Sequence, residues 1–279
     1  MYLIGSAKTE SRYKEPKSMQ LILDKIKLPS ELSRISRPRL LAELRVALNS
    51  CTSTIINGRA GTGKTLLAND FALSCGRRIA WYKVDASDSD RRIFFQYLVE
   101  SVLAQRPDFA AHAIMQLVET SGIEDIPLLA ESFIYELLES GSDPLLIVIE
   151  DLHLIYDADW VVPFFRRLLP LLPAEAHMLI TGRSLPPAPL WRMRSKQTLC
   201  VVDEAMLAFS KEEAKELYAT YGLTSAQASA GHKQTRGRAS ALDALARLLS
   251  ASPQPTSRQR RADARRGLRV VQQLHGYVF

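Results

Sequence analysis

The feature that most constrains this chain is the octapeptide GRAGTGKT at residues 58–65. Its G-x-x-x-x-G-K-[ST] spacing is that of a phosphate-binding loop, in which backbone N–H groups and a helix N-terminus surround a phosphate. An apolar, β-branched run at residues 53–56 precedes the octapeptide, and a helix-like stretch at residues 65–74 follows it. This strand–loop–helix context favours a phosphate site over a glycine-rich surface loop that happens to precede a helix.

The positions of the loop have distinct expected roles. Glycines without a Cβ let the backbone wrap closely around a phosphate. Lys64 is expected to reach the outer phosphates of a triphosphate, and the Thr65 hydroxyl is expected to ligate Mg²⁺. The candidate nucleotide-binding residues of the loop are Gly58, Arg59, Ala60, Gly61, Thr62, Gly63, Lys64 and Thr65.

Apolar runs alternate with helix-like stretches up to about residue 207. The run LLIVI at 145–149 has five consecutive apolar residues, as a strand buried on both faces of a parallel sheet requires. The other expected strands lie at 53–56, 78–84, 177–181 and 198–202. Helices are expected at 38–50, 65–74, after the acidic turn 85–90, near 110–118, and at 126–140 and 158–171. This alternation predicts an α/β fold of the P-loop NTPase type, with a doubly wound parallel sheet.

After Leu207 the strand pattern stops. Ser210 and Glu213 have the spacing of a capping box, Gly222 is expected to end the helix that follows, and a second helix is expected at 239–250. The expected organisation is a flexible segment (1–24), a nucleotide-binding domain (25–207), a small all-helical appendage (208–251) and a basic, disordered tail (252–279).

Charge and cysteine content indicate which partners the protein can bind and in which cellular compartment it lies. The net charge is +6, but the segment from Leu217 onward holds ten basic and two acidic residues and therefore carries +8. Arginine clusters favour weak, salt-sensitive binding to polyanions, whereas nothing in this tail has the pattern of a recognition helix. Three scattered cysteines, a polar N-terminus and the lack of an apolar run of about 20 residues predict a cytoplasmic protein that does not contact a membrane.

Two carboxylates, Glu150 and Asp151, follow the buried run at 145–149 directly. Phosphoryl transfer to water needs one carboxylate near Mg²⁺ and another that orients the attacking water. We therefore expect Glu150 to help hold Mg²⁺ and Asp151 to act on the water, against the alternative of an ordinary acidic loop. Arg183, just past the strand expected at 177–181, is either a γ-phosphate ligand or a solvated arginine. We leave His153 out of the catalytic set, because a lone histidine is more often a structural hydrogen-bonding group.

The order of these blocks resembles a known family. The segments KIKLPSELSRISRPRLLAEL, GRAGTGKT, WYKVDASDSDRRIFFQYL, LLIVIEDLHLI, LITGRSLP and LAFSKEEAKEL are similar to the nucleotide-binding module of the MalT-like, ATP-dependent LuxR-family transcriptional activators, which are signal-transduction ATPases of the STAND class. The resemblance runs from about residue 25 to 249. It implies ATP or ADP and Mg²⁺ as cofactors, a place for Arg37 and Pro38 beside the adenine or ribose, and a γ-phosphate-sensing role for Arg183.

The chain departs from the family pattern in three ways. Glu150–Asp151 stands where the family usually has two aspartates, and Arg238 stands where it usually has tryptophan. Family members usually continue into a helical effector-binding region and a DNA-reading helix-turn-helix, so DNA binding is expected only through a C-terminal domain that this chain lacks. The leading interpretation is a slowly hydrolysing regulatory ATPase switch with nucleotide-dependent self-association. The alternatives are a non-hydrolysing nucleotide-binding scaffold and a small-molecule or nucleotide kinase.

Overall fold

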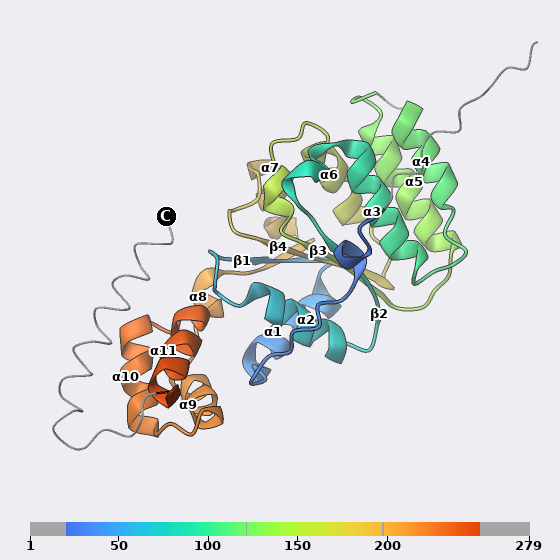
Figure 1. The fold of residues 1–279 in the computed structure, drawn as a ribbon. Helices are drawn as coiled ribbons and strands as arrows, with labels where there is room; N and C mark the ends of the chain where they lie inside the picture. Colours follow the sequence, from blue (N-terminus) through green and yellow to red (C-terminus); the bar gives the residue numbers. More distant parts are fainter. Residues whose placement is uncertain (1–20, 121, 197, 252–279) are drawn as a thin grey trace, which may run out of the picture.

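Five parallel strands form one sheet at the centre of the molecule (Figure 1). The computed structural model describes residues 21–120, 122–196 and 198–251. The strands are β1 (Ser53–Asn57), β2 (Arg78–Lys83), β3 (Leu145–Glu150), β4 (Ala176–Gly182) and β5 (Leu199–Val202). Their spatial order is β2-β3-β4-β1-β5, and every neighbouring pair is parallel. The predicted doubly wound parallel sheet is confirmed, and the five expected strands agree with the observed ones to within one or two residues.

Two layers of helices cover the sheet. One face carries α1 (Pro38–Ser50) and α2 (Lys64–Ser74), and the other carries α3 (Arg91–Leu103), α4 (Ala111–Thr120), α5 (Ile126–Glu139) and α6 (Val161–Leu171) (Figure 1). Side chains of β3 alternate between the two layers: Leu146 and Val148 pack with α1 and α2, whereas Ile147 and Ile149 pack with α3 to α6. All six residues of β3 are buried, as the apolar run predicts.

Short helices and 3-10 turns connect the main elements. They are the helices α7 (Ala188–Trp191) and α8 (Glu204–Leu207) and the 3-10 turns η1 (Leu23–Ile26), η2 (Ala86–Ser89), η3 (Leu152–Ile155) and η4 (Arg192–Lys196). The acidic turn caps a helix as expected, through Asp90, whose carboxylate accepts hydrogen bonds from the N–H groups of Arg92 and Ile93. Asp85 instead caps the 3-10 turn η2.

Three helices follow the sheet and share a small apolar cluster of their own. They are α9 (Lys211–Thr220), α10 (Ser225–Thr235) and α11 (Ala239–Ala251), which we call the helical region; it forms a bundle beside one end of the sheet (Figure 1). Ser210 and Glu213 form the predicted capping box, and Gly222, at a φ of +70°, follows the end of α9 in the left-handed conformation.

Helix α10 is a correction to the sequence analysis, which predicted only two helices after residue 207. Its sequence, SAQASAGHKQT, has no apolar stripe, so hydrophobic periodicity does not reveal it. A capping box between Thr224 and Gln227 begins the helix. The spacing of these two residues was the feature of the sequence from which the helix could have been predicted. The close approach of Tyr218 to α10 requires glycine at position 231, because a Cβ there would clash with the tyrosine hydroxyl.

The predictions for residues 1–20 and for the basic tail, 252–279, lie outside the described residues. Residues 23–26 form the turn η1, and the Lys25 Nζ lies 2.7 Å from carboxylate oxygens of both Asp85 and Asp88. Among the described residues, no helix has the length and apolar character needed to span a bilayer.

Candidate nucleotide site

The octapeptide lies where β1 ends and α2 begins. Gly61 and Gly63 adopt φ values of +74° and +88°, in the left-handed region that favours glycine, and Gly63 caps the N-terminus of α2. The Gly58 N–H donates to the carbonyl oxygen of Gly182 at 3.1 Å, which ties the start of the loop to the end of β4. The loop thus sits at the carboxyl edge of the sheet with a helix N-terminus directed at it, the arrangement that binds anions in α/β proteins.

Lys64 is folded back over the loop. Its Nζ donates to the carbonyl oxygens of Gly58 at 2.6 Å and Arg59 at 3.0 Å, and only 7% of the residue is exposed. Burial lowers the pKa of Lys64, while the nearby Asp151 carboxylate acts in the opposite direction. The loop therefore holds the Lys64 ammonium against neutral carbonyl oxygens, and a phosphate oxygen, which carries negative charge, would attract this ammonium more strongly.

Thr65 and Glu150 meet across the gap between α2 and the end of β3. The Thr65 hydroxyl donates a short hydrogen bond to Glu150 Oε1. Glu150 is 3% exposed, and its Oε2 is buried without a hydrogen-bond partner in the described part of the chain. A hydroxyl and a carboxylate are oxygen ligands that Mg²⁺ prefers, and Mg²⁺ commonly takes one or two such protein ligands beside phosphates and water. The unpartnered Oε2 therefore fits a cation at this position.

Asp151 lies beside Glu150 and in reach of two basic side chains. It adopts a φ of +59°, and its N–H donates to Thr181 Oγ1 at 3.0 Å. Its Oδ1 lies 3.7 Å from both Arg183 Nε and His153 Nδ1. Burial lowers the pKa of His153, which favours its neutral form, although Asp151 opposes this shift. The structure thus brings Glu150, Asp151 and Arg183 to the same edge of the sheet as the loop, and the side chain of Arg183 is half exposed.

Arg37 and Pro38 lie at the N-terminus of α1, and Arg37 contacts the helical region through Glu213. The Arg37 Nη2 donates to the carbonyl oxygens of Leu207 at 2.9 Å and Ala208 at 3.2 Å, and lies 3.2 Å from Glu213 Oε2. Only 4% of Arg37 is exposed, and burial lowers the pKa of its guanidinium. Pro38 opens α1 and is exposed. Their predicted place beside an adenine or ribose stays a prediction.

The sequence analysis missed several residues that contact the loop. Glu204 accepts hydrogen bonds from the Arg59 N–H at 2.9 Å and from Arg59 Nε at 2.8 Å. Glu204 lies two residues after β5, the strand next to β1, so an acidic residue soon after the fifth strand was a usable signal. Arg238 and Ser240, near the start of α11, contact the loop from the helical region.

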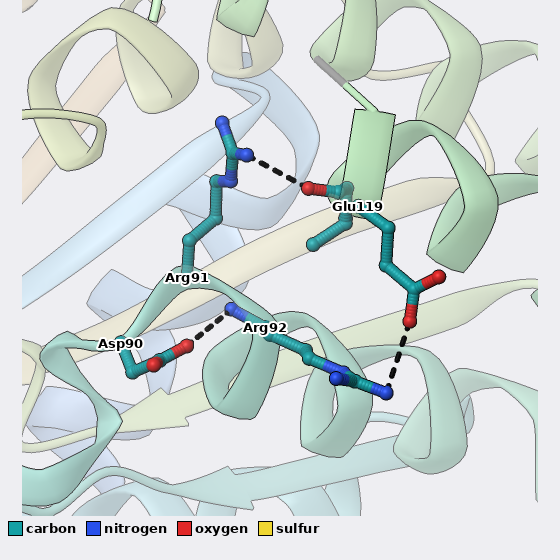
Figure 2. A pocket seen from close by; sticks show the side chains of 5 residues that line it. Asp90, Arg91, Arg92 and Glu119 are labelled. Atoms are coloured by element: carbon teal, nitrogen blue, oxygen red, sulfur yellow. Dashed lines mark hydrogen bonds and ion pairs between the residues drawn. The ribbon is translucent and has the colours of Figure 1, made fainter. Parts of the chain in front are cut away.

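A separate surface hollow of about 680 Å³ is lined by Asp90, Arg91, Arg92, Val118 and Glu119 (Figure 2). Its charged side chains are directed at one another and at the backbone: Arg92 lies 3.0 Å from Glu119, and the Arg91 Nη2 donates to the Val118 carbonyl oxygen at 2.7 Å. The predicted site residues do not line this hollow, so we assign no nucleotide to it.

Comparison with known proteins agrees with this geometry. The family model of the AAA ATPase domain matches residues 35–181, which is more than half of the chain. The chain belongs to the AAA ATPase domain family. It is 30% identical, over 253 residues, to the HTH-type transcriptional regulator MalT of Serratia proteamaculans (strain 568). That match covers 86% of this chain but 27% of the relative, so the chain corresponds to a MalT-like nucleotide-binding module and spans about a quarter of that protein.

A solved structure shares the fold. It is a signal transduction ATPase with numerous domains (STAND) with a tetratricopeptide repeat sensor, from Pyrococcus horikoshii, with a TM-score of 0.55 and 19% sequence identity. The likeness covers 84% of this chain and 32% of that one. At this level of identity the comparison bears on the fold, and the fold it indicates is that of the STAND ATPases.

Proposed function

We propose that this chain is the nucleotide-operated switch module of a MalT-like transcriptional regulator, which binds ATP with Mg²⁺ and hydrolyses it slowly. The observation that carries the proposal is the contact between Thr65 and Glu150. It joins the end of the phosphate-binding loop to the acidic tip of β3, where a cation bound to the outer phosphates of ATP would lie. Family membership and the similarity to MalT support the regulatory class of ATPase.

The binding step follows from the loop. The N–H groups of residues 58–65 and the N-terminus of α2 would surround the phosphates, and the Lys64 ammonium would leave its carbonyl partners for the outer phosphate oxygens. Thr65 and Glu150 would hold Mg²⁺, which when bound neutralises charge on the β- and γ-phosphates.

The hydrolytic step is assigned to Asp151. Its partly exposed carboxylate would accept a hydrogen bond from water and orient the water oxygen toward the γ-phosphorus. The new bond joins that oxygen to phosphorus, the bond from phosphorus to the β–γ bridging oxygen breaks, and the proton passes to Asp151 and then to solvent. Glu150 is longer than the aspartate that the family usually has there, and the longer side chain would shift the bound cation and slow turnover.

The switch would act through Arg183 and the helical region. A guanidinium within reach of the γ-phosphate but not of ADP makes an interaction that differs between the two nucleotide states, and only such a difference can shift a conformational equilibrium. We propose that the ATP state promotes self-association in the cytoplasm. DNA would be read by a separate C-terminal domain, as the name of the relative MalT suggests.

Phosphate release under single-turnover conditions tests the catalytic part. We expect Asp151→Asn to bind ATP within a few-fold of the wild type, because the amide keeps its shape, but to lose at least about a hundredfold in hydrolysis, the usual contribution of a positioned base. Asp157→Asn, an exposed carboxylate on the following turn, is the matched control and should be unaffected. Hydrolysis by Asp151→Asn at the wild-type rate would rule out Asp151 as the base.

The same assay separates the alternative functions. A wild-type protein that binds ATP but releases no phosphate is a scaffold, and one that loses γ-phosphate only when a small-molecule or nucleotide acceptor is added is a kinase. The nucleotide that copurifies gives a second reading, since retained ADP favours a slow switch. Light scattering with ADP and with a non-hydrolysable ATP analogue tests the self-association.

A further inference from the structure

Residues at the start of α11 donate hydrogen bonds to two carbonyl oxygens of the phosphate-binding loop. The Arg238 Nη2 donates to the carbonyl oxygen of Ala60 at 2.7 Å, and the Ser240 N–H donates to the carbonyl oxygen of Gly61 at 2.9 Å. Glycine is required at position 61 by its positive φ and also by this contact, because a Cβ there would clash with Ser240 Oγ. These contacts join residues almost 180 positions apart in the sequence.

The two hydrogen bonds constrain the donors of the loop. A peptide unit is planar and trans, so its carbonyl and its N–H point in opposite directions within one rigid plane. Fixing the carbonyl of Ala60 therefore fixes the direction of the Gly61 N–H, and fixing the carbonyl of Gly61 fixes that of the Thr62 N–H. These N–H groups belong to the set that a phosphate-binding loop directs inward at its anion. Both carbonyls accept hydrogen bonds from the start of the helical region.

The rest of the loop is held from other elements. Lys64, in α2, holds the carbonyls of Gly58 and Arg59, and Glu204, in α8, holds the N–H and the side chain of Arg59. The helical region thus supplies the two contacts at the middle of the loop. Detaching α11 would leave the peptides between Ala60 and Thr62 free to rotate, at an entropic cost to any phosphate that must order them again.

We propose that Arg238 is a positioning residue for nucleotide binding, through which docking of the helical region sets the direction of two loop N–H donors. The proposal rests on the nucleotide site proposed above. If the proposal is right, docking of the helical region raises the affinities for ADP and for ATP by the same factor. The reason is that the two oriented peptide units belong to the loop, and neither is a group that contacts only the γ-phosphate. By linkage, either nucleotide must also strengthen the docking of α11 by the factor that docking adds to its affinity.

A direct contact between Arg238 and a phosphate is the competing role. The Arg238 Nε is buried and has no hydrogen-bond partner in the described part of the chain, so it is a donor that a ligand would be able to use. A γ-phosphate contact would change the affinity for ATP and leave that for ADP intact. The ratio of the two affinities therefore distinguishes positioning from direct contact.

Isothermal titration of the full chain with ADP and with MgATP is the test. We expect Arg238→Met, which keeps the length of the side chain but removes its donors, to weaken both affinities roughly tenfold and to leave their ratio unchanged. Arg238→Lys keeps a donor for the Ala60 carbonyl and should recover part of the loss. Arg236→Met removes the same charge from an exposed position two residues away and should stay within about twofold of wild type. Unfolding midpoints without nucleotide check that each variant is folded.

The possible outcomes distinguish failure of the Arg238 role from failure of the proposed nucleotide site. If Lys64→Ala binds nucleotide normally, the proposed site itself is wrong. If Lys64→Ala loses binding but Arg238→Met matches Arg236→Met, only the positioning role is overturned. A loss confined to ATP also overturns it, in favour of a direct γ-phosphate contact, and so does a loss that Arg238→Lys does not relieve.

Discussion

Strand β4 runs from the amino edge of the sheet to the carboxyl edge, and the polar groups at the two edges are paired differently. Near its start, His177 is 2% exposed, and both ring nitrogens are partnered, Nε2 with Thr54 Oγ1 at 3.0 Å and Nδ1 with the Cys51 carbonyl at 3.1 Å. At the carboxyl edge, at the end of the neighbouring strand β3, Glu150 Oε2 is buried without a hydrogen-bond partner in the described residues, and Asp151 Oδ1 lies 3.7 Å from Arg183 Nε. The polar atoms of His177 are thus satisfied by internal hydrogen bonds, whereas the carboxyl edge keeps a buried carboxylate oxygen that a ligand can complete.

The pairing of buried polar groups distinguishes a ligand site from a structural polar cluster. A buried polar group that stays unpaired costs free energy, so folds usually pair such groups internally. His177 shows the usual solution, and its burial lowers its pKa to about 4, well below the ordinary value, because the neutral ring is favoured. At the carboxyl edge, the unpaired Glu150 Oε2 lies beside the phosphate-binding loop, which is the pattern of a ligand-binding site.

The largest expected effect is that of Lys64→Ala. Removing the ammonium removes a charge-assisted contact to the outer phosphates, and the affinities for ADP and ATP should fall by roughly a hundredfold. Isothermal titration measures this directly, and the unfolding midpoint confirms that the variant is folded. Unchanged affinity would mean that the carboxyl edge is not where the phosphates bind.

Glu150→Gln should alter the requirement for Mg²⁺. The amide oxygen can still accept the hydrogen bond from Thr65, but it lacks the charge that attracts a cation. We expect the Mg²⁺ concentration for half-maximal ATP binding to rise between about 10- and 100-fold. Glu139→Gln, at the exposed end of α5, should leave that concentration unchanged. Equal Mg²⁺ dependence in both variants would remove Glu150 from the cation site.

Arg183→Ala should act on ATP alone. The loss of a charge-assisted contact to the γ-phosphate should reduce the preference for ATP over ADP about tenfold and abolish any ATP-driven self-association. Arg192→Ala, an exposed arginine downstream, serves as the control. If the ratio of ATP to ADP affinity is the same in the Arg183 variant and the wild type, Arg183 does not sense the nucleotide.

The smallest effect on nucleotides is expected at the amino edge. His177→Gln should leave ATP affinity within about twofold of wild type, because His177 lies near the start of β4, at the edge of the sheet opposite the loop. It should change stability instead. With a folded pKa near 4 and an unfolded pKa of about 6.5, the unfolded chain takes up the proton first, so stability is present at neutral pH and falls as the pH drops through this window.

Urea unfolding at two pH values measures that change. The wild type should lose about 2 kcal/mol between pH 7.5 and pH 5 through His177, and the variant should lose correspondingly less. A His177→Gln protein with the full pH dependence of the wild type would show that this histidine is not held neutral by burial.

The fold was predictable where one local pattern settles the structure. The apolar run 145–149 is compatible with few structures other than a buried strand, and the loop 58–65 with few other than a phosphate-binding loop. Together they predict that Thr65 and Glu150 lie at one edge of the sheet. Helix α10 was missed because its stability depends on capping and on packing against Tyr218, not on an apolar stripe. The contact between Arg238 and Ala60 was out of reach, because only the docking of the helical region brings these residues together.

Hydrogen exchange measured by mass spectrometry, with and without MgATP, tests the assignment of the two sheet edges most directly. Ligand contacts should slow exchange in peptides covering the loop at 58–65, the acidic tip at 150–153 and the start of α11 at 239–243. Peptides covering the amino edge at 51–54 and the hollow around Arg92 and Glu119 should exchange at the same rate in both conditions. Protection confined to the amino edge or to that hollow would contradict the assignment of the nucleotide to the carboxyl edge of the sheet.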